Sequence, residues 1–266
     1  MPDRRPERCS PAPSPTLPVW GYHTGLTPER WHTVYPACTE PGSPVDIATG
    51  TLGDADPADP VELDLRPTRW RVLNTGRTVQ AEPAGPDGGP GPGRAGGFTV
   101  ATTRYTVAQL HFHAPSEHTF DGAAAAMEIH VVATSADDAV TVIGAPLRIG
   151  PGPTALGLVL DAVPSEVTPA PFGRIATGIT TGGSVTTDEL DLSDVLPVGR
   201  DTVRYLGSLT TPPCTGGVLW HVYTTPVTVS ADEAAGFTAV HHGNVRPVQP
   251  LHDRELSVRT VVNAPA

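Results

Sequence analysis

Three histidines in the middle of the chain have a spacing that suits a shared metal ion. His111 and His113 are separated by one residue, and His130 follows 17 residues later. On a β-strand, side chains two residues apart point to the same face and lie about 6–7 Å apart. Three neutral imidazoles with one open position form a catalytic zinc site, whereas four protein ligands form a structural one.

The run 103–113, which carries the first pair, is predicted to be a strand. Strict alternation places Val107 and Gln109 on the face of the two histidines, with Leu110 and Phe112 on the other face. Gln109 therefore lies beside His111. Since histidine ligands usually donate their second N–H to such a group, Gln109 is predicted to orient that ring.

A second strand is predicted over 126–133. Glu128, His130 and Val132 share one face, so Glu128 is the predicted partner of His130. The spacing alone leaves two alternatives open. Histidines of a half-buried strand can be ordinary hydrogen-bonded core residues, and nickel, copper or iron could occupy three imidazoles as well as zinc.

The rest of the chain predicts a β-rich protein. Its 266 residues fit one large domain or two small ones, and the 28 glycines and 31 prolines favour strands and turns over a helical bundle. Ser230 and Glu233 form a predicted capping box at the start of a short helix. Strand-like runs are Trp70–Leu73, Tyr105–His113, Ala126–Ala133, Val140–Ile149, Leu156–Leu160, Val218–Val229 and Leu256–Val262.

Other features limit the function classes. Residues 1–18 are predicted to be a flexible lead, and Ala81–Gly97 a loose surface loop or insertion. No run of about 18 apolar residues exists to span a membrane, and the N-terminus has no apolar segment typical of a signal peptide. A formal net charge of -11 argues against nucleic acid as a partner.

The run QLHFHAPSEHTFDG…MEIHVV, from Gln109 to Val132, resembles the alpha-class carbonic anhydrases. Further matches are SLTTPPC, NVRPVQPL, WGY and SPVDI, so the resemblance runs from about Trp20 to Ala264. It implies a mainly β, single catalytic domain over residues 19–266. That domain is expected to hold a large, twisted, mostly antiparallel central sheet with short peripheral helices, and an active-site cone that reaches zinc on the sheet.

The resemblance also implies roles for individual residues. Zinc is expected on His111, His113 and His130, oriented by Gln109, Glu128 and the backbone of Asn244. Thr210 is expected to accept a hydrogen bond from zinc-bound hydroxide and to donate its own proton to Glu117. Thr211 is expected to contact bicarbonate, and His118 to be a core residue near Tyr205. The expected apolar wall for carbon dioxide comprises Val132, Val142, Leu209, Val218 and Trp220.

The implied activity is the zinc-dependent, reversible hydration of carbon dioxide to bicarbonate and a proton, by attack of zinc-bound hydroxide. Sulfonamides and anions are the expected inhibitors. Two alternatives are a silent binding module of the same fold and a zinc esterase. The three histidines, Thr210 and Glu117 are all present, which argues against the silent module.

Arg77 is a departure from the family pattern. It stands in the run Asn74–Val79, where the family carries a proton-shuttling histidine. Arginine stays protonated, whereas imidazole titrates near neutral pH. The sequence therefore predicts impaired proton shuttling with slow, buffer-dependent turnover, unless His23 or His32 substitutes.

Cys38 and Cys214 coincide with the disulfide pair of secreted family members, which leaves Cys9 in the predicted lead. A bridge implies an oxidising, extracytoplasmic compartment, either periplasmic or secreted. Because no signal peptide is visible, the two observations conflict and the location stays open.

Overall fold

The computed structural model describes residues 20–39, 41–169, 182–196 and 198–265. The predicted lead over residues 1–18 and Cys9 lie outside the described residues. The strands are β1 (Asp46–Ile47), β2 (Val61–Leu65), β3 (Thr68–Asn74), β4 (Val79–Pro83), β5 (Gly96–Val100), β6 (Thr103–His113), β7 (Thr119–Phe120), β8 (Ala123–Ala124), β9 (Met127–Thr134), β10 (Val140–Gly150), β11 (Val185–Leu190), β12 (Asp201–Ser208), β13 (Gly216–Tyr223), β14 (Val227–Ser230) and β15 (Ser257–Asn263). The helices are η1 (Pro28–Thr33), η2 (Pro36–Thr39), η3 (Thr49–Thr51), α1 (Gly157–Leu160), η4 (Leu192–Asp194) and α2 (Ala231–Val240).

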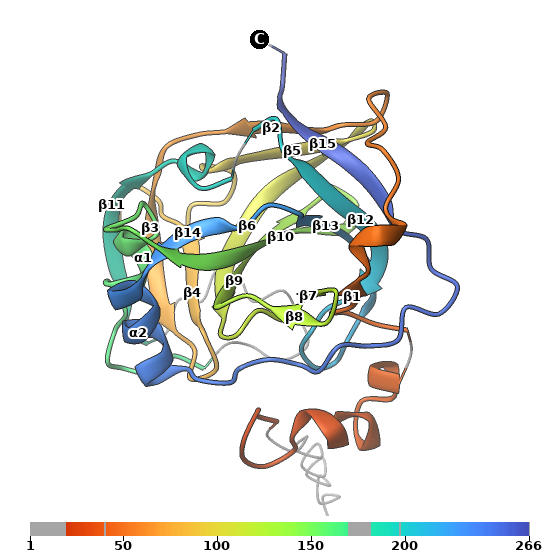
Figure 1. The fold of residues 1–266 in the computed structure, drawn as a ribbon. Coiled ribbons are helices and arrows are strands. Elements are labelled where there is room, and N and C mark those ends of the chain that lie inside the picture. Colours follow the sequence, from red (N-terminus) through yellow and green to blue (C-terminus); the bar gives the residue numbers. More distant parts are fainter. Residues whose placement is uncertain (1–19, 40, 170–181, 197, 266) are drawn as a thin grey trace, which may run out of the picture.

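One 12-stranded sheet dominates the molecule, and Figure 1 shows that it is strongly twisted and curled. From β6 the pairings run through β9, β10, β13, β12, β15, β2 and β5, and then return to β6. Most neighbours are antiparallel; β10 with β13, β10 with β14, and β15 with β2 are parallel. The expected large, twisted, mainly antiparallel sheet is confirmed.

Both faces of the central strands are buried, because these strands carry apolar residues on both faces. Met127, Ile129 and Val131 of β9 enter the larger hydrophobic core. Val132, on the opposite face, enters a second core with Trp220 of β13. Burial on both sides fixes the register, because a shift of one residue would exchange the two faces.

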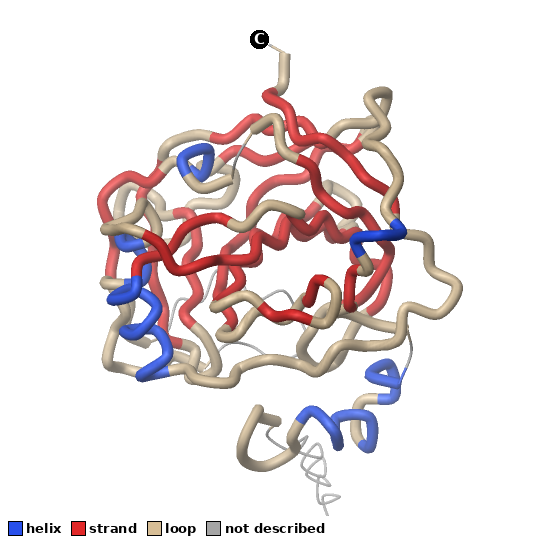
Figure 2. Tube along the Cα trace, viewed as in Figure 1, coloured by secondary structure: helices blue, strands red, loops and turns tan. Residues whose placement is uncertain are grey.

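Short helices lie at the periphery of the sheet (Figure 2). Helix α2 begins at the predicted capping box, in which Ser230 and Glu233 each satisfy the other's backbone N–H. Among the described residues, no helix is both long and apolar enough to cross a membrane.

The predicted strand Leu156–Leu160 is wrong, because this run forms the short helix α1. Leu156, Val159 and Leu160 are buried together, and that spacing of three and four residues is helical. A run of five apolar residues fits either period, so the sequence could not decide. The predicted strand Val218–Val229 is two strands, β13 and β14, separated at Thr224–Pro226.

The loose loop predicted over Ala81–Gly97 is shorter than predicted, because both of its ends belong to strands. Strand β4 continues to Pro83, an isolated bridge joins Ala84 to Pro90, and β5 begins at Gly96. Gly91 permits this tight packing, because a Cβ there would lie 2.6 Å from the Ala84 backbone. Gly91 therefore serves close backbone packing within this segment.

Residues 20–39 form a small lobe beside the sheet, which is the orange segment in Figure 1. Trp20, Trp31 and Tyr35 pack there against the predicted disulfide, Cys38–Cys214, which the structure contains. The bridge joins η2 to the loop that follows β12.

Candidate metal centre and active site

Strands β6 and β9 bring the three predicted histidines together. His111 pairs directly with His130 in the antiparallel ladder, and His113 follows two residues later on the same face. The ring centroids are 4.6–5.1 Å apart. One ring nitrogen from each lies within 4.8 Å of the other two. The side-chain convergence expected from the spacing is therefore present.

A β-bulge between Val107 and Gln109 changes one detail of that prediction. Strict alternation placed Val107 on the histidine face, but Val107 lies in the opposite core with Leu110 and Phe112. A bulge inserts one extra residue, so the alternation shifts at that point. From Gln109 onward the predicted faces are correct.

The outer nitrogen of each histidine donates to a fixed acceptor. His111 Nδ1 lies 2.9 Å from Gln109 Oε1, and His113 Nδ1 lies 2.7 Å from the Asn244 carbonyl. His130 Nε2 lies 3.0 Å from Glu128 Oε1. Because these acceptors need a hydrogen from the ring, each second nitrogen is left with a lone pair. The three predicted partners are therefore all in place.

These second nitrogens fit a metal ion. His113 Nε2 is buried and, within the described part of the chain, has no hydrogen-bond partner. Burial, reinforced by repulsion from His113 and His130, holds the pKa of His111 well below its ordinary value. Burial also lowers the pKa of His113. Neutral imidazoles with unshared lone pairs are the form that binds a divalent transition metal.

Glu117 lies beside this centre, fully buried. Its Oε1 accepts the backbone N–H of Arg246 at 2.8 Å. Its Oε2 lies 3.4 Å from His113 Nε2 and accepts no hydrogen bond from any described residue. Thr210 is buried in the loop after β12, but the predicted hydrogen bond from Thr210 to Glu117 is not formed. The role of Thr210 stays a prediction.

The loop that carries Thr210 and Thr211 is tied down at both ends. Leu209 N–H donates to the Thr215 carbonyl at 2.9 Å, and Cys214 N–H donates to the Thr211 carbonyl at 2.8 Å. The disulfide then fixes Cys214 to the lobe of residues 20–39.

An apolar surface extends from the histidines across β9, β10 and β13. Val142 pairs with Val132 on one side and with Trp220 on the other. The Trp220 ring lies 4.8 Å from the His130 ring. All five residues predicted for the apolar wall belong to one cluster: Val132, Val142, Val218, Trp220 and the partly buried Leu209.

A buried hydrogen-bonded chain supports the centre from behind. Glu128 Oε1 accepts from both His130 Nε2 and, at 2.7 Å, His118 Nδ1. His118 Nε2 lies 2.6 Å from the Tyr205 hydroxyl, which donates to Ser43. Burial alone would raise the pKa of Glu128, but the two imidazoles hold it well below its usual value. The prediction that His118 is a core residue near Tyr205 agrees with this geometry.

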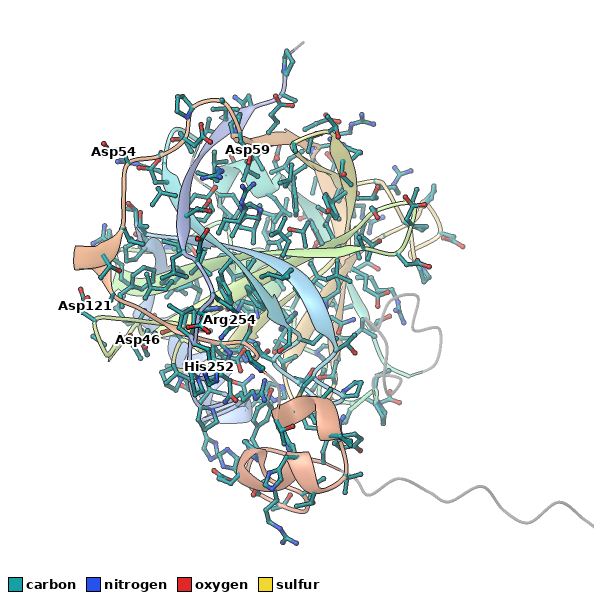
Figure 3. The ribbon with its side chains drawn as sticks, turned by 90° about the vertical axis from the view of Figure 1, so that its right-hand side faces the viewer. Asp46, Asp54, Asp59, Asp121, His252 and Arg254 are labelled. Carbon is teal, nitrogen blue, oxygen red and sulfur yellow. A yellow bond between two sulfur atoms is a disulfide. The ribbon has the colours of Figure 1, made fainter. Side chains whose placement is uncertain are left out.

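Two arginines that were not predicted to act here fix the same region. Arg246 donates to the carbonyls of Ser43 and Cys38, while its backbone N–H holds Glu117. Arg254, in the segment before β15, lies over the Tyr205 ring at 5.6 Å (Figure 3). Their partners lie far away in the sequence, so no local pattern could reveal them.

Arg77 is engaged in structural contacts. Its guanidinium lies 4.1 Å from the centre of the Trp20 ring and donates to the Trp20 carbonyl from Nε and Nη2. The Arg77 carbonyl accepts from the Asn244 amide at 3.1 Å. Arg77 thus joins the lobe of residues 20–39 to the segment that orients His113.

Comparison with known proteins agrees with this site. The profile of the eukaryotic-type carbonic anhydrase family matches residues 26–260. The carbonic anhydrase of Pectobacterium carotovorum is 32% identical over 241 residues, which cover 88% of each chain. The Photobacterium profundum alpha-carbonic anhydrase superposes with a TM-score of 0.74 at 29% identity, covering 90% of this chain and 99% of that one.

A second solved structure, the alpha-carbonic anhydrase of Thermovibrio ammonificans in complex with sulfanilamide, has a TM-score of 0.72 and 32% identity. The match covers 90% of this chain and 99% of that one. With the family profile spanning most of the sequence and solved relatives matching 90% of it, this chain belongs to the eukaryotic-type, or alpha-class, carbonic anhydrase family.

Proposed function

We propose that the protein catalyses the reversible hydration of carbon dioxide at a zinc ion held by His111, His113 and His130. The observation that carries this proposal is the set of three hydrogen bonds that the outer histidine nitrogens donate to Gln109, Glu128 and the Asn244 carbonyl. They leave three lone pairs converging on one point, and three imidazoles with an open position are typical of catalytic zinc.

A zinc ion bound there would lower the pKa of a water molecule to about 7, a value established on carbonic anhydrases themselves, and so supply a nucleophile at neutral pH. The chain's own residues would bind the substrate, orient it and handle protons.

Glu117 is proposed to determine the direction of hydrogen bonding at the reacting oxygen. Its Oε2 is buried, and no described residue donates to it. If Thr210 donates its hydroxyl proton to this oxygen, the Thr210 oxygen can only accept. The attacking oxygen must then donate to Thr210, which turns a lone pair toward carbon dioxide and fixes its orientation.

The apolar cluster is the proposed resting place for carbon dioxide. Val142, Val218 and Trp220 offer no hydrogen bond, so a water molecule beside them forgoes hydrogen bonds that it would make in bulk water. A nonpolar molecule has no such hydrogen bonds to lose. Bicarbonate is charged and would leave this surface for water. We place the contact with bicarbonate at Thr211, the next residue of the loop.

Arg77 is proposed to contribute nothing to proton removal, because its guanidinium remains protonated and is bound to the Trp20 carbonyl. Turnover is therefore expected to depend on buffer. The disulfide between Cys38 and Cys214 supports, as a further proposal, a working environment outside the reducing cytoplasm.

The test is metal content and activity measured on the same preparation. Protein dialysed against zinc is expected to hold one ion per chain, to hydrate carbon dioxide and to be inhibited by sulfanilamide. His111→Ala should lose the ion and the activity, while His252→Ala, on an exposed turn, should keep both. Zinc-loaded wild type with no hydration activity would refute the proposed function.

A further inference from the structure

Hydration releases one proton for each carbon dioxide consumed, and this proton must leave the site. Imidazole is the side chain whose ordinary pKa suits the task at neutral pH. Among the ten histidines, His111, His113 and His130 are assigned to the metal, and His118, His221 and His241 are buried. The exposed ones are His23, His32, His242 and His252.

Two of these four, His23 and His242, lie at the segment whose Asn244 carbonyl orients His113. His23 Nε2 lies 2.8 Å from the His242 carbonyl, and the two rings stack with centroids 5.1 Å apart at 18°. Two residues further along, the Asn244 carbonyl accepts from His113. Among the described residues, neither His32 nor His252 has a comparable contact.

The connection places His23 near the metal centre. It consists of two hydrogen bonds, of 2.8 and 2.7 Å, and two residues of chain that span at most about 7 Å. His23 Nε2 therefore lies no more than about 13 Å from His113 Nδ1.

Gly243 is shaped to receive the His23 ring. Its φ is +60°, and a Cβ at that position would lie 2.9 Å from His23 Cε1. Its N–H donates to the Ala114 carbonyl at 2.9 Å, directly after the strand that carries His113. The ring is thus seated against Gly243, which is hydrogen-bonded to the residue that follows His113, and His23 is exposed to solvent.

The hydrogen bond to His242 also determines which nitrogen can act as a base. A carbonyl only accepts, so His23 Nε2 carries the hydrogen and Nδ1 has the free lone pair. Within the described residues, Nδ1 has no hydrogen-bond partner. When Nδ1 takes up a proton, the bond from Nε2 is retained and the ring need not move.

We propose that His23, seated on Gly243 and stacked on His242, is the proton acceptor for this enzyme, in place of the position occupied by Arg77. This inference rests on the proposed function. A proton leaves the reacting water, passes along intervening water molecules and forms an N–H bond at His23 Nδ1. A buffer base in solution then removes it and restores the neutral ring. His242 lies beside His23 as the second titratable group of the pair, and Tyr22 adjoins it in the chain.

The test uses zinc-loaded enzyme and the exchange of ¹⁸O between carbon dioxide and water, followed by mass spectrometry. This assay gives two rates: interconversion of carbon dioxide and bicarbonate, and release of labelled water, which requires a proton. His23→Gln retains an amide that can donate to the His242 carbonyl but cannot titrate. It should lower the release rate about tenfold and leave interconversion within a factor of two.

Added imidazole should restore release in His23→Gln, while the matched control His32→Gln should resemble wild type in both rates. An unchanged release rate in His23→Gln would overturn the inference. So would an equal fall in both rates without rescue by imidazole, because that pattern marks a structural role. A wild-type enzyme without interconversion would instead refute the proposed function, and this inference with it.

Discussion

Gly144 offers a test of the metal centre that alters no polar residue. It lies in β10, opposite His130 in the ladder. A Cβ at this position would lie 2.8 Å from Glu128 Oε1, a separation that real Cβ atoms essentially never show. In Gly144→Ala, the carboxylate must therefore shift by about 0.5 Å to restore an ordinary van der Waals contact.

Glu128 has little freedom to make that shift. Its two oxygens accept from the His118 N–H at 2.8 Å, from His118 Nδ1 at 2.7 Å and from His130 Nε2 at 3.0 Å. The bond to His130 is the longest, and a further 0.5 Å takes it beyond hydrogen-bonding distance. His130 would then lose the partner that orients its ring.

Losing such a partner typically costs 10–100-fold in metal affinity, or about 1.4–2.7 kcal/mol. We expect this loss in the zinc dissociation constant of Gly144→Ala, measured at pH 7.5 by competition with a fluorescent chelator. Glu128→Gln should change affinity in the same direction without altering the packing of β10. Both carboxylate oxygens of Glu128 accept hydrogen bonds, whereas the amide NH2 that replaces one of them can only donate, and the negative charge is lost.

Gly236→Ala is the matched control, because a Cβ at Gly236 in α2 has nothing within 4 Å. Its zinc affinity should equal that of wild type. If Gly144→Ala remains folded and binds zinc within threefold of wild type, the proposed role of Glu128 is incorrect.

Two further predictions concern stability. Replacing Cys38 and Cys214 together by serine should lower the free energy of unfolding by up to about 5 kcal/mol, because the bridge closes a loop spanning 176 positions; urea unfolding with and without reductant measures this, and a change below about 1 kcal/mol would contradict it. His221 is buried with neither ring nitrogen hydrogen-bonded to a described residue, and burial, with smaller effects from Arg204 and Arg259, lowers its pKa to about 3. His221→Leu should therefore raise the free energy of unfolding by about 1–3 kcal/mol at neutral pH. Between pH 6.5 and 3 the unfolded chain binds a proton at His221 that the folded chain does not. As the pH falls through this range, the unfolding free energy of wild type should therefore decrease by up to about 1.4 kcal/mol per pH unit relative to that of the variant. If urea unfolding gave the same difference in unfolding free energy between wild type and His221→Leu at every pH, this reasoning would be refuted.

The parts of the fold that could be predicted from sequence are those with strong apolar alternation. Strands β6, β9 and β10 are long and repeat with period two, so both their existence and the faces of His111 and His130 follow from local pattern. Among the strands of the main sheet, β2, β4, β5, β11 and β12 were not predicted. All of these except β12 have six residues or fewer, and β5 begins with two glycines whose role is close approach to neighbouring backbone: a Cβ on Gly97 would lie 1.9 Å from the Tyr105 carbonyl oxygen.

The residues of the site also fall into those that a local sequence pattern predicts and those that it does not. Gln109 and Glu128 could be predicted because each lies two residues from its histidine, and a strand places both on one face. Arg246 and Ser43 could not. Arg246 lies 129 positions from Glu117 and 203 from Ser43, so only the closed sheet brings them together. The bulge at Val107 could likewise not be predicted, because one extra residue in a strand does not change its composition in a recognisable way.

The closed circuit of strands has a consequence for how the protein matures. The circuit contains one link between the two ends of the described chain: β15 (Ser257–Asn263), the last strand, pairs with β2 (Val61–Leu65), the first strand of the main sheet. On a ribosome this link cannot form until β15 has been made, about 200 residues after β2, and pairings so distant in sequence form slowly. The Asn244 carbonyl that orients His113 is likewise made more than 100 residues after His113. The complete metal site should therefore form well after the synthesis of the strands that carry its three histidines.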